Sequence, residues 1–493
     1  MSSAKFHLVP TALLTLLLPH AAHASDPARE SPPHTRCVGA PEAGTWTPTP
    51  ADPYPLMAAG WGPELGGGMM ASRWVEDWSG VKAAGHAPAL KAIPLGGTAR
   101  LSLSSEVRLR YATWNNAQLV RANDMHQAQL RAVIGADLRL DPHVRVFGEL
   151  GTGQVDRRQD SAAANFQNDL SLQQLFVDIR AAAGETLAGA IIGRQEFSDG
   201  PRQLISLSDG PDLHRSWNGV RFYLHGARHR IGVFDLRATR LGRNGFDETV
   251  DHRETLQGFT ASFVVSPGEG PNTYLEPFWF HTRNPAGRTA GLDDRNTFGA
   301  RLWGRIGKAR FDWTAARQTG RAIDGRSVDA WGLFAVQSLE LSDTGWKPRL
   351  TSHIDLATGG ADDTGSVQDF NPLYASSNYL GESQFLGLTN LLLFAPGVAL
   401  APTVRTTLSF EYAYARRLQE SDAVYGGGMR PYVGTEAIAG QSIGGLARLS
   451  GTWSATPNLS LSLNFEHLDA GTVLERAGYA SGSYGYLSAT YRY

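Results

Sequence analysis

From about residue 98 to its end, the sequence alternates between apolar and polar residues with a period of two. In residues 101–111 the odd positions are Leu, Leu, Ser, Val, Leu and Tyr, whereas the even positions are Ser, Ser, Glu, Arg and Arg. The alternation returns in residues 130–140, 144–150 and 459–466. A strand of this kind lies with one face against an apolar phase and the other against a polar phase. The chain is therefore predicted to be all-β.

Two architectures use such strands: a soluble sandwich or propeller with an apolar core, and a membrane barrel with its apolar faces towards lipid. Here the polar faces carry Arg, Glu and Asp at strand centres, and aromatic residues cluster near strand ends. Residues 487–493 form an alternating strand ending on Tyr493, which resembles the C-terminal assembly signal of bacterial outer-membrane barrels. We therefore predict a transmembrane antiparallel β-barrel of the outer-membrane porin type. Roughly 395 residues, at about 9–11 per strand plus loops, give about 18 strands.

The N-terminus carries the one continuous apolar run of the sequence, at residues 8–18. Lys5 precedes this run, and Ala-His-Ala at residues 22–24 follows it. The run is too short to span a bilayer and predicts a signal peptide over residues 1–24. Residues 25–72 are rich in proline, which blocks helices and central strands. We expect this stretch to be an irregular periplasmic segment and residues 73–493 to form the barrel; Cys37 is given no role.

The composition excludes several classes of function. A net charge of -2 gives no support to nucleic-acid binding, which usually requires a strongly basic face. The 20 Phe, 15 Tyr and 12 Trp residues are too many for a disordered chain. A single cysteine argues against a disulfide scaffold and against a cysteine zinc module. We expect no nucleic-acid partner, no metal and no cofactor.

Short sequence blocks in a fixed order resemble the alginate-export family of outer-membrane porins. Leu-Gln-Gln-Leu-Phe-Val-Asp at residues 172–178 and Gly-Arg-Gln-Glu-Phe at residues 193–197 are the most recognisable. The other blocks are residues 76–79, 91–95, 101–110, 202–205, 210–212 and 215–221, followed by 370–374 with Gly381 and Asn390. The chain departs from the family pattern at residues 104–106, at residues 198–199 and at residues 208–209, where Ser-Asp replaces an Arg-Glu pair.

The resemblance implies a barrel of about 18 strands whose arginine-rich constriction passes an anionic polysaccharide. Carried over by position, the candidate constriction residues are Arg194, Glu196, Arg202, Arg215 and Arg221. Period two places Arg194 and Glu196 on one face of their strand.

Arginine supplies most of the positive charge, since only five of the 45 basic residues are lysine. Arg108, Arg110 and Arg145 lie on polar strand faces and join the candidates for solute binding. Their planar side chains can bind a carboxylate bidentately. Two alternative origins of this arginine content stay open. A GC-rich coding sequence favours arginine, and a ladder of arginines with carboxylates such as Glu106 and Glu149 would simply order a wide lumen.

Three weak motifs suggest other chemistry. Gly-Gln-Ser-Ile-Gly at residues 440–444 matches the serine-hydrolase elbow, but a strand pattern follows where the elbow needs a helix. His225 and His229 have a helical spacing but fall in a predicted hairpin turn. The acidic pairs at residues 293–294 and 362–363 could bind calcium, but they lack EF-hand spacing.

The prediction is a passive channel in the bacterial outer membrane rather than an enzyme. Its expected partners are the membrane lipid, the barrel-assembly machinery acting through the strand that ends at Tyr493, and an anionic polysaccharide, oligosaccharide or other small solute. The alternative is an outer-membrane barrel hydrolase that acts on lipid or surface polymer through Ser442. An energised receptor ranks last, because too few residues precede the barrel to form a plug domain.

Overall fold

The structure is a computed structural model that describes residues 69–78, 88–156, 163–184, 186–226, 228–265, 273–284, 293–361 and 365–493. The predicted signal peptide, Cys37 and most of the predicted periplasmic segment lie outside these residues. Among the described residues, no helix has both the length and the apolar character needed to cross a bilayer.

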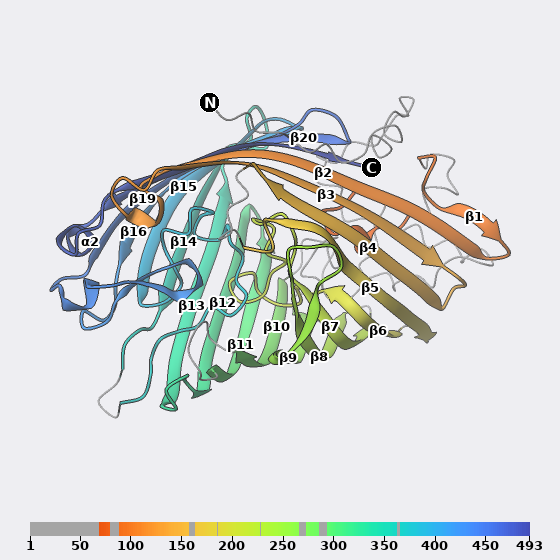
Figure 1. Cartoon of the computed structure of the whole chain (residues 1–493), viewed down its shortest axis with the longest axis horizontal. Helices are drawn as coiled ribbons and strands as arrows, with labels where there is room; N and C mark the ends of the chain where they lie inside the picture. The colour runs from red at the N-terminus through yellow and green to blue at the C-terminus, as the bar shows by residue number, and fades with distance from the viewer. Residues whose placement is uncertain are drawn as a thin grey trace.

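Eighteen of the described strands form one closed antiparallel barrel, which confirms the predicted fold class (Figure 1). The first half is β2 (Ala99–Asn115), β3 (Met125–Arg139), β4 (Val144–Val155), β5 (Asn168–Ala183), β6 (Thr186–Glu196), β7 (Ser216–His225), β8 (His229–Arg240), β9 (Thr249–Val264) and β10 (Thr273–Asn284). The second half is β11 (Asp293–Ile306), β12 (Ala309–Arg321), β13 (Ser327–Glu340), β14 (Arg349–Ala357), β15 (Leu391–Thr403), β16 (Thr406–Arg416), β19 (Ser442–Ser454), β20 (Leu459–Ala470) and β21 (Gly482–Arg492). The short strand β1 (Ile93–Gly96) pairs only with β2.

The barrel closes between β2 and β21, where Arg108 lies opposite Thr490. Beyond the last paired strand residue, the backbones of Ser105 and Tyr493 exchange hydrogen bonds of 2.8 and 2.9 Å. In Figure 1 the C-terminus accordingly lies beside β2. The C-terminal residue thus takes part in the closure that removes the free edges of the sheet.

The two ends of the barrel differ in their connections. At one end, which we call the short-turn rim, tight turns join successive strands, such as residues 140–143 and 404–405. At the other end, the long-loop rim, residues 197–215, 358–390 and 417–441 connect them. The last of these loops carries β17 (Val424–Gly426), η4 (Gly427–Met429), β18 (Arg430–Tyr432) and η5 (Thr435–Ala437). The helices η3 (Ala117–Leu119) and α2 (Thr472–Arg476) lie in other loops of this rim.

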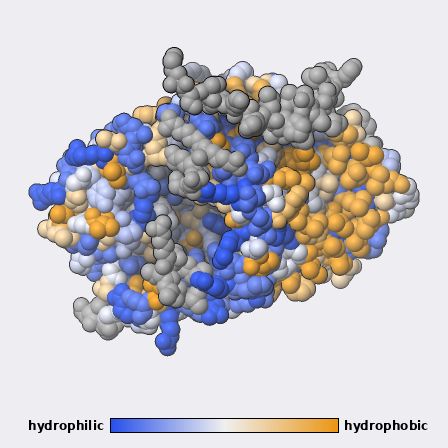
Figure 2. Space-filling view, viewed as in Figure 1, coloured by the Kyte–Doolittle hydropathy of each residue, from blue (hydrophilic) through white to orange (hydrophobic). Residues whose placement is uncertain are grey.

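The outer face is apolar and the inner face carries the charged side chains, together with an apolar cluster that contacts the inward loops. Leu109 on β2 is 56% exposed, whereas its neighbours Arg108 and Arg110 are buried inside the barrel. Figure 2 shows a broad hydrophobic area on one side and hydrophilic residues around a hollow. On the outside, the rings of Phe259, Trp279 and Phe298 follow one another across β9, β10 and β11. Such an aromatic row is typical of the boundary between lipid and water.

Above this row, towards the long-loop rim, the outer face becomes polar. The side chain of Gln257 donates to Asp235 at 2.9 Å and contacts His281 at 3.2 Å. His281 in turn contacts Asp294 at 2.9 Å. Since charged groups avoid the hydrocarbon core, this hydrogen-bonded row indicates where the outer face leaves the apolar phase.

Candidate functional site

Two loops of the long-loop rim fold into the lumen and meet there. The first inward loop is residues 197–215, between β6 and β7, and the second is residues 358–390, between β14 and β15. Ile205 and Tyr374 form a parallel bridge between them. The backbone N–H of Tyr374 donates to the carbonyl of Leu204 at 2.8 Å, and that of Ser376 donates to the carbonyl of Arg202 at 2.8 Å. The two loops therefore form one partition across the lumen.

Lumen-facing side chains of the barrel hold the second inward loop from more than one wall. Arg448 on β19 donates to the carbonyl of Tyr379 at 3.0 Å, and Glu466 on β20 accepts the backbone N–H of Glu382 at 2.9 Å. Glu382 also binds Arg110 on β2 at 2.8 Å. The loop is thus tied to strands on both sides of the barrel closure.

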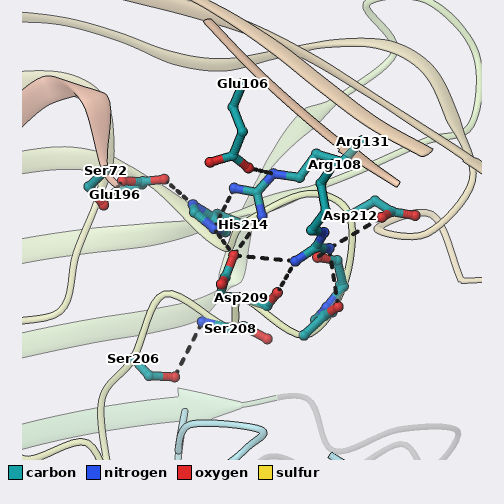
Figure 3. Close-up of polar contacts among 12 residues, drawn as sticks. Ser72, Glu106, Arg108, Arg131, Glu196, Ser206, Ser208, Asp209, Asp212 and His214 are labelled. Atoms are coloured by element: carbon teal, nitrogen blue, oxygen red, sulfur yellow. Dashed lines mark hydrogen bonds and ion pairs between the residues drawn. The ribbon is translucent and has the colours of Figure 1, made fainter. Parts of the chain in front are cut away.

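The first inward loop is tied to the wall by a set of ionic contacts that we call the charged ring (Figure 3). Arg131 on β3 binds Glu106 on β2 at 3.1 Å and Asp209 of the loop at 2.6 Å. Asp209 also contacts His214 Nε2 at 2.7 Å, and His214 Nδ1 contacts Glu196 at the end of β6. The ring consists of Ser72, Arg73, Glu106, Arg131, Glu196, Asp209 and His214.

The segment that precedes the barrel completes this ring. Arg73 begins the short helix η2 (Arg73–Val75), and its guanidinium reaches Glu106 at 3.4 Å and Glu149 on β4 at 2.5 Å. Ser72 Oγ donates to Glu196 Oε2 at 2.6 Å. Glu196 therefore receives hydrogen bonds from both the N-terminal segment and the first inward loop.

Two carboxylates, those of Glu196 and Asp209, flank the imidazole of His214. Burial and the nearby Arg131 act to lower the pKa of His214, but Glu196 and Asp209 outweigh them and raise it above the ordinary value. His214 Nδ1 faces Glu196, and His214 Nε2 faces both Asp209 and Arg131 Nη2, each at 2.7 Å. Ser72 does not contact the imidazole but bonds to Glu196, so the group lacks the serine–histidine contact of a hydrolytic triad.

Five of the predicted arginines bind other groups of the protein, so their guanidinium groups are not available to a passing solute. Arg108 donates to the carbonyl of Pro211 at 2.6 Å, and Arg110 binds Glu382 while stacking on Tyr486 at 4.2 Å. Arg145 binds Asp137 at 2.6 Å, Arg221 binds Asp199 at 3.2 Å, and Arg194 binds Glu248 at 3.0 Å. Arg145 and Arg221 are both 0% exposed.

Arg202 and Arg215 have a different environment. Both belong to the first inward loop, and each stacks over a tyrosine of the second: Arg202 over Tyr379 at 5.1 Å and Arg215 over Tyr374 at 4.8 Å. Arg202 is exposed, and within the described residues it forms no ion pair with a carboxylate. Because stacking on Tyr379 uses the face of the Arg202 guanidinium, the in-plane N–H groups of Arg202 stay available for an anion.

The structure differs from the sequence prediction for Arg194 and Glu196. They do not share an environment: Glu196 contacts Ser72 and His214 inside the barrel, whereas Arg194 donates to Asn218 at 3.0 Å on the face that carries the exposed Ile192. Period two fails here because β6 ends at Glu196 and the chain turns inward to begin the first loop.

The sequence model of the family described as alginate export matches residues 99–486, from the first barrel strand into the last. The chain belongs to the alginate export family. No curated protein matches it.

Solved structures share the fold of this alginate export family member at low sequence identity. Pseudomonas aeruginosa OccD3 (OpdP) aligns with a TM-score of 0.56 and 11% identity over 80% of this chain and 91% of that one. Pseudomonas aeruginosa OpdK, crystallised with vanillate, gives 0.52 and 11% over 79% and 98%. Acinetobacter baumannii OccAB4 gives 0.52 and 9% over 80% and 98%.

In this family member, the weak motifs of the sequence lie in ordinary structural positions. Ser442 is the first residue of β19, paired with Arg416, and the strand continues where a nucleophile elbow requires a helix. His225 ends β7 and His229 begins β8. Asp293 binds Arg295 at 2.7 Å, while residues 362–363 lie outside the described residues. No group of three potential metal ligands occurs among the residues that the structure describes.

Sequence reasoning missed four members of the charged ring: Ser72, Arg73, Asp209 and His214. Asp209 is one of the residues at which the chain departs from the family pattern, and this departure was the only signal pointing to it. The other three lie in irregular segments, where no period relates a side chain to the lumen.

Proposed function

We propose that this chain is a passive outer-membrane channel for anionic solutes, in which Arg202 provides the charge that a solute meets. The observation that supports this role for Arg202 is its exposure without a carboxylate partner among the described residues, while Arg108, Arg110, Arg145 and Arg221 are neutralised or buried. Local unpaired charges in a narrow lumen govern selectivity more than the net charge of the protein does.

The solute class that fits best is a carboxylate-bearing sugar polymer of the alginate type, or an oligosaccharide of it. An arginine fork binds a planar carboxylate bidentately, and arginine keeps its charge at every physiological pH. Tyr374 and Tyr379 stack on the guanidinium groups of Arg215 and Arg202 and limit the rotation of these two side chains. The structure of OpdK with vanillate makes small organic anions the second candidate class.

The hydrolase alternative has less support, because Ser442 lies on a continuous strand and Ser72 lacks a histidine contact. Diffusion through a lumen needs neither a nucleophile nor a cofactor. The proposal also places the protein in the bacterial outer membrane. It includes the removal of residues 1–24 and the recognition of the last strand by the assembly machinery.

The experiment is a current-block titration in planar bilayers. Oligouronates are added to one side, and neutral oligosaccharides of the same length serve as the matched control. We expect the uronates to block at lower concentration, and the Arg202→Ala variant to lose that difference. Equal block by charged and neutral sugars in the unsubstituted protein would contradict an anionic solute.

A further inference from the structure

Residues 69–78 form a finger that enters the lumen from the short-turn rim. Both of its ends lie at that rim: Met69 Sδ accepts from Asn458 in the turn between β19 and β20 at 3.2 Å, and Asp77 binds Arg139 at the end of β3 at 2.6 Å. The N–H of Met70 donates to Glu76 Oε1 at 3.1 Å and closes the base of the finger. The tip, Ser72 and Arg73, reaches the charged ring.

The shaft of the finger packs against an apolar cradle on the inner wall of the barrel. Trp74 is 4% exposed and meets Phe176 edge to face at 6.0 Å between ring centroids. Arg221 stacks on the same indole at 5.2 Å, and Arg145 donates to the carbonyl of Trp74. The cradle consists of Phe147, Phe176, Leu187, Ile191 and Tyr223, contributed by β4, β5, β6 and β7. A channel wall has no need of such a patch unless an apolar residue covers it.

Two buried carboxylates of the wall keep an arginine partner without the finger. Glu106 binds Arg73 but also Arg131 at 3.1 Å and Arg492 at 2.7 Å. Asp137 keeps Arg145 at 2.6 Å when Asp77 leaves Arg139. Withdrawal of the finger would therefore not leave Glu106 and Asp137 alone. It would remove Arg73 from Glu149, which keeps a hydrogen bond from Gln174 at 3.2 Å, and it would remove Glu76 from Lys91.

The tip of the finger and the first inward loop share the same carboxylates. Glu196 accepts from Ser72 of the finger and from His214 of the loop. Glu106 binds Arg73 of the finger and Arg131, which in turn holds Asp209 of the loop. A movement of the tip therefore changes the environment of Glu196 and Glu106, two carboxylates through which the wall contacts the first inward loop.

We propose that residues 69–78 are an autoinhibitory plug, inserted from the short-turn rim, whose withdrawal both widens the lumen and loosens the first inward loop. This device is independent of which solute the channel carries. The closed state is held by Trp74 in its cradle and by Arg73 between Glu106 and Glu149, and these two side chains define the test.

The test compares an Arg73→Ala/Trp74→Ala double variant with an Arg301→Ala variant. Arg301 is a lumen-facing arginine paired with Glu276 and Asp312, and it does not touch the finger, so it controls for the loss of a buried lumenal charge. The readout is the swelling rate of liposomes in a neutral oligosaccharide, which is insensitive to ion selectivity. Heat-modifiable mobility in detergent gels confirms that each barrel is folded.

We expect severalfold faster swelling for the double variant and an unchanged rate for Arg301→Ala. Equal rates for the folded double variant and the unsubstituted protein would overturn the proposal. A second measurement uses Ser72→Cys in a Cys37→Ser background, which leaves one thiol at the tip. The proposal requires that a bulky maleimide labels this thiol slowly, and that labelling becomes faster once Trp74→Ala is added. Equally fast labelling of the proteins with and without Trp74→Ala would also overturn the proposal.

Discussion

The guanidinium of Arg202 lies 5.1 Å over the ring of Tyr379, so this contact joins the two inward loops and fixes the position of an exposed cation. The hydroxyl of Tyr379 donates to Asp355 on β14 at 2.5 Å, which fixes the ring to the barrel wall. The position of the exposed charge is therefore set by a chain of contacts from the strand to the tyrosine and from the tyrosine to the arginine.

Replacing Arg202 by alanine is expected to lower the preference for anions without changing assembly. A unit charge about 4 Å from an ion in a water-filled lumen contributes about 1 kcal/mol, or about a fivefold change in the permeability ratio. Reversal potentials in a salt gradient across a planar bilayer measure this ratio. An unchanged reversal potential in correctly folded barrels would remove Arg202 from the selectivity determinants.

Arg221→Ala is the matched variant and should behave in the opposite way. Arg221 is 0% exposed and binds Asp199, so a passing ion does not meet it. Its loss weakens a buried ion pair and its stack on Trp74, with an expected cost of about 3–5 kcal/mol in the free energy of unfolding. Urea unfolding of the barrel in lipid vesicles should show this loss, while the reversal potential stays that of the unsubstituted protein.

The contrast between these two arginines also shows what a sequence can predict here. The strands, their two faces and the approximate strand number follow from the alternation, because a barrel wall imposes period two along its whole length. The pairing of Arg131 with Glu106 is an instance of the arginine–carboxylate ladder that the polar faces suggested. Within the regular strands the prediction and the structure agree, whereas at the end of β6 the predicted common face of Arg194 and Glu196 is not found.

The inward loops and the finger could not be predicted in the same way. Arg202 and Arg221 lie in neighbouring family blocks, yet one is exposed and the other is buried against Trp74, a residue far away in the sequence. Their difference depends on the finger at residues 69–78 and on the meeting of two loops at Ile205 and Tyr374. Contacts of this kind leave no local period.

The pH dependence of the charged ring follows from His214. Its pKa is raised by Glu196 and Asp209, so its stabilising contribution is complete below the ordinary histidine pKa of about 6.5 and is lost as pH rises through the raised value. We expect the first inward loop to become more susceptible to proteolysis as pH increases over this range. His214→Gln should be susceptible at every pH and show a flatter profile, whereas parallel profiles for both proteins would contradict the role given to His214.

Ser442→Ala tests the enzymatic alternative. Because Ser442 opens a regular strand, its replacement should change neither conductance nor the stability of the barrel beyond about 0.5 kcal/mol, the range of ordinary surface substitutions. Purified protein and variant are compared in esterase and glycosidase assays. A hydrolytic activity that disappears in the variant would restore the hydrolase hypothesis.

Deletion of Tyr493 should impair assembly into the outer membrane. Tyr493 closes the barrel through its two backbone hydrogen bonds to Ser105, its hydroxyl accepts the N–H of Leu90 at 3.2 Å, and Lys91 lies 5.6 Å over its ring. Tyr493→Phe is the matched control, since it keeps the backbone and the ring and loses only the hydroxyl contact.

Outer-membrane fractionation and heat-modifiable mobility report the folded fraction. We expect that fraction to fall for the deletion and to be unchanged for Tyr493→Phe, because closure and recognition of the last strand depend on its backbone and terminal aromatic. Normal assembly of the deletion variant would show that β21 is recognised and closed without its last residue.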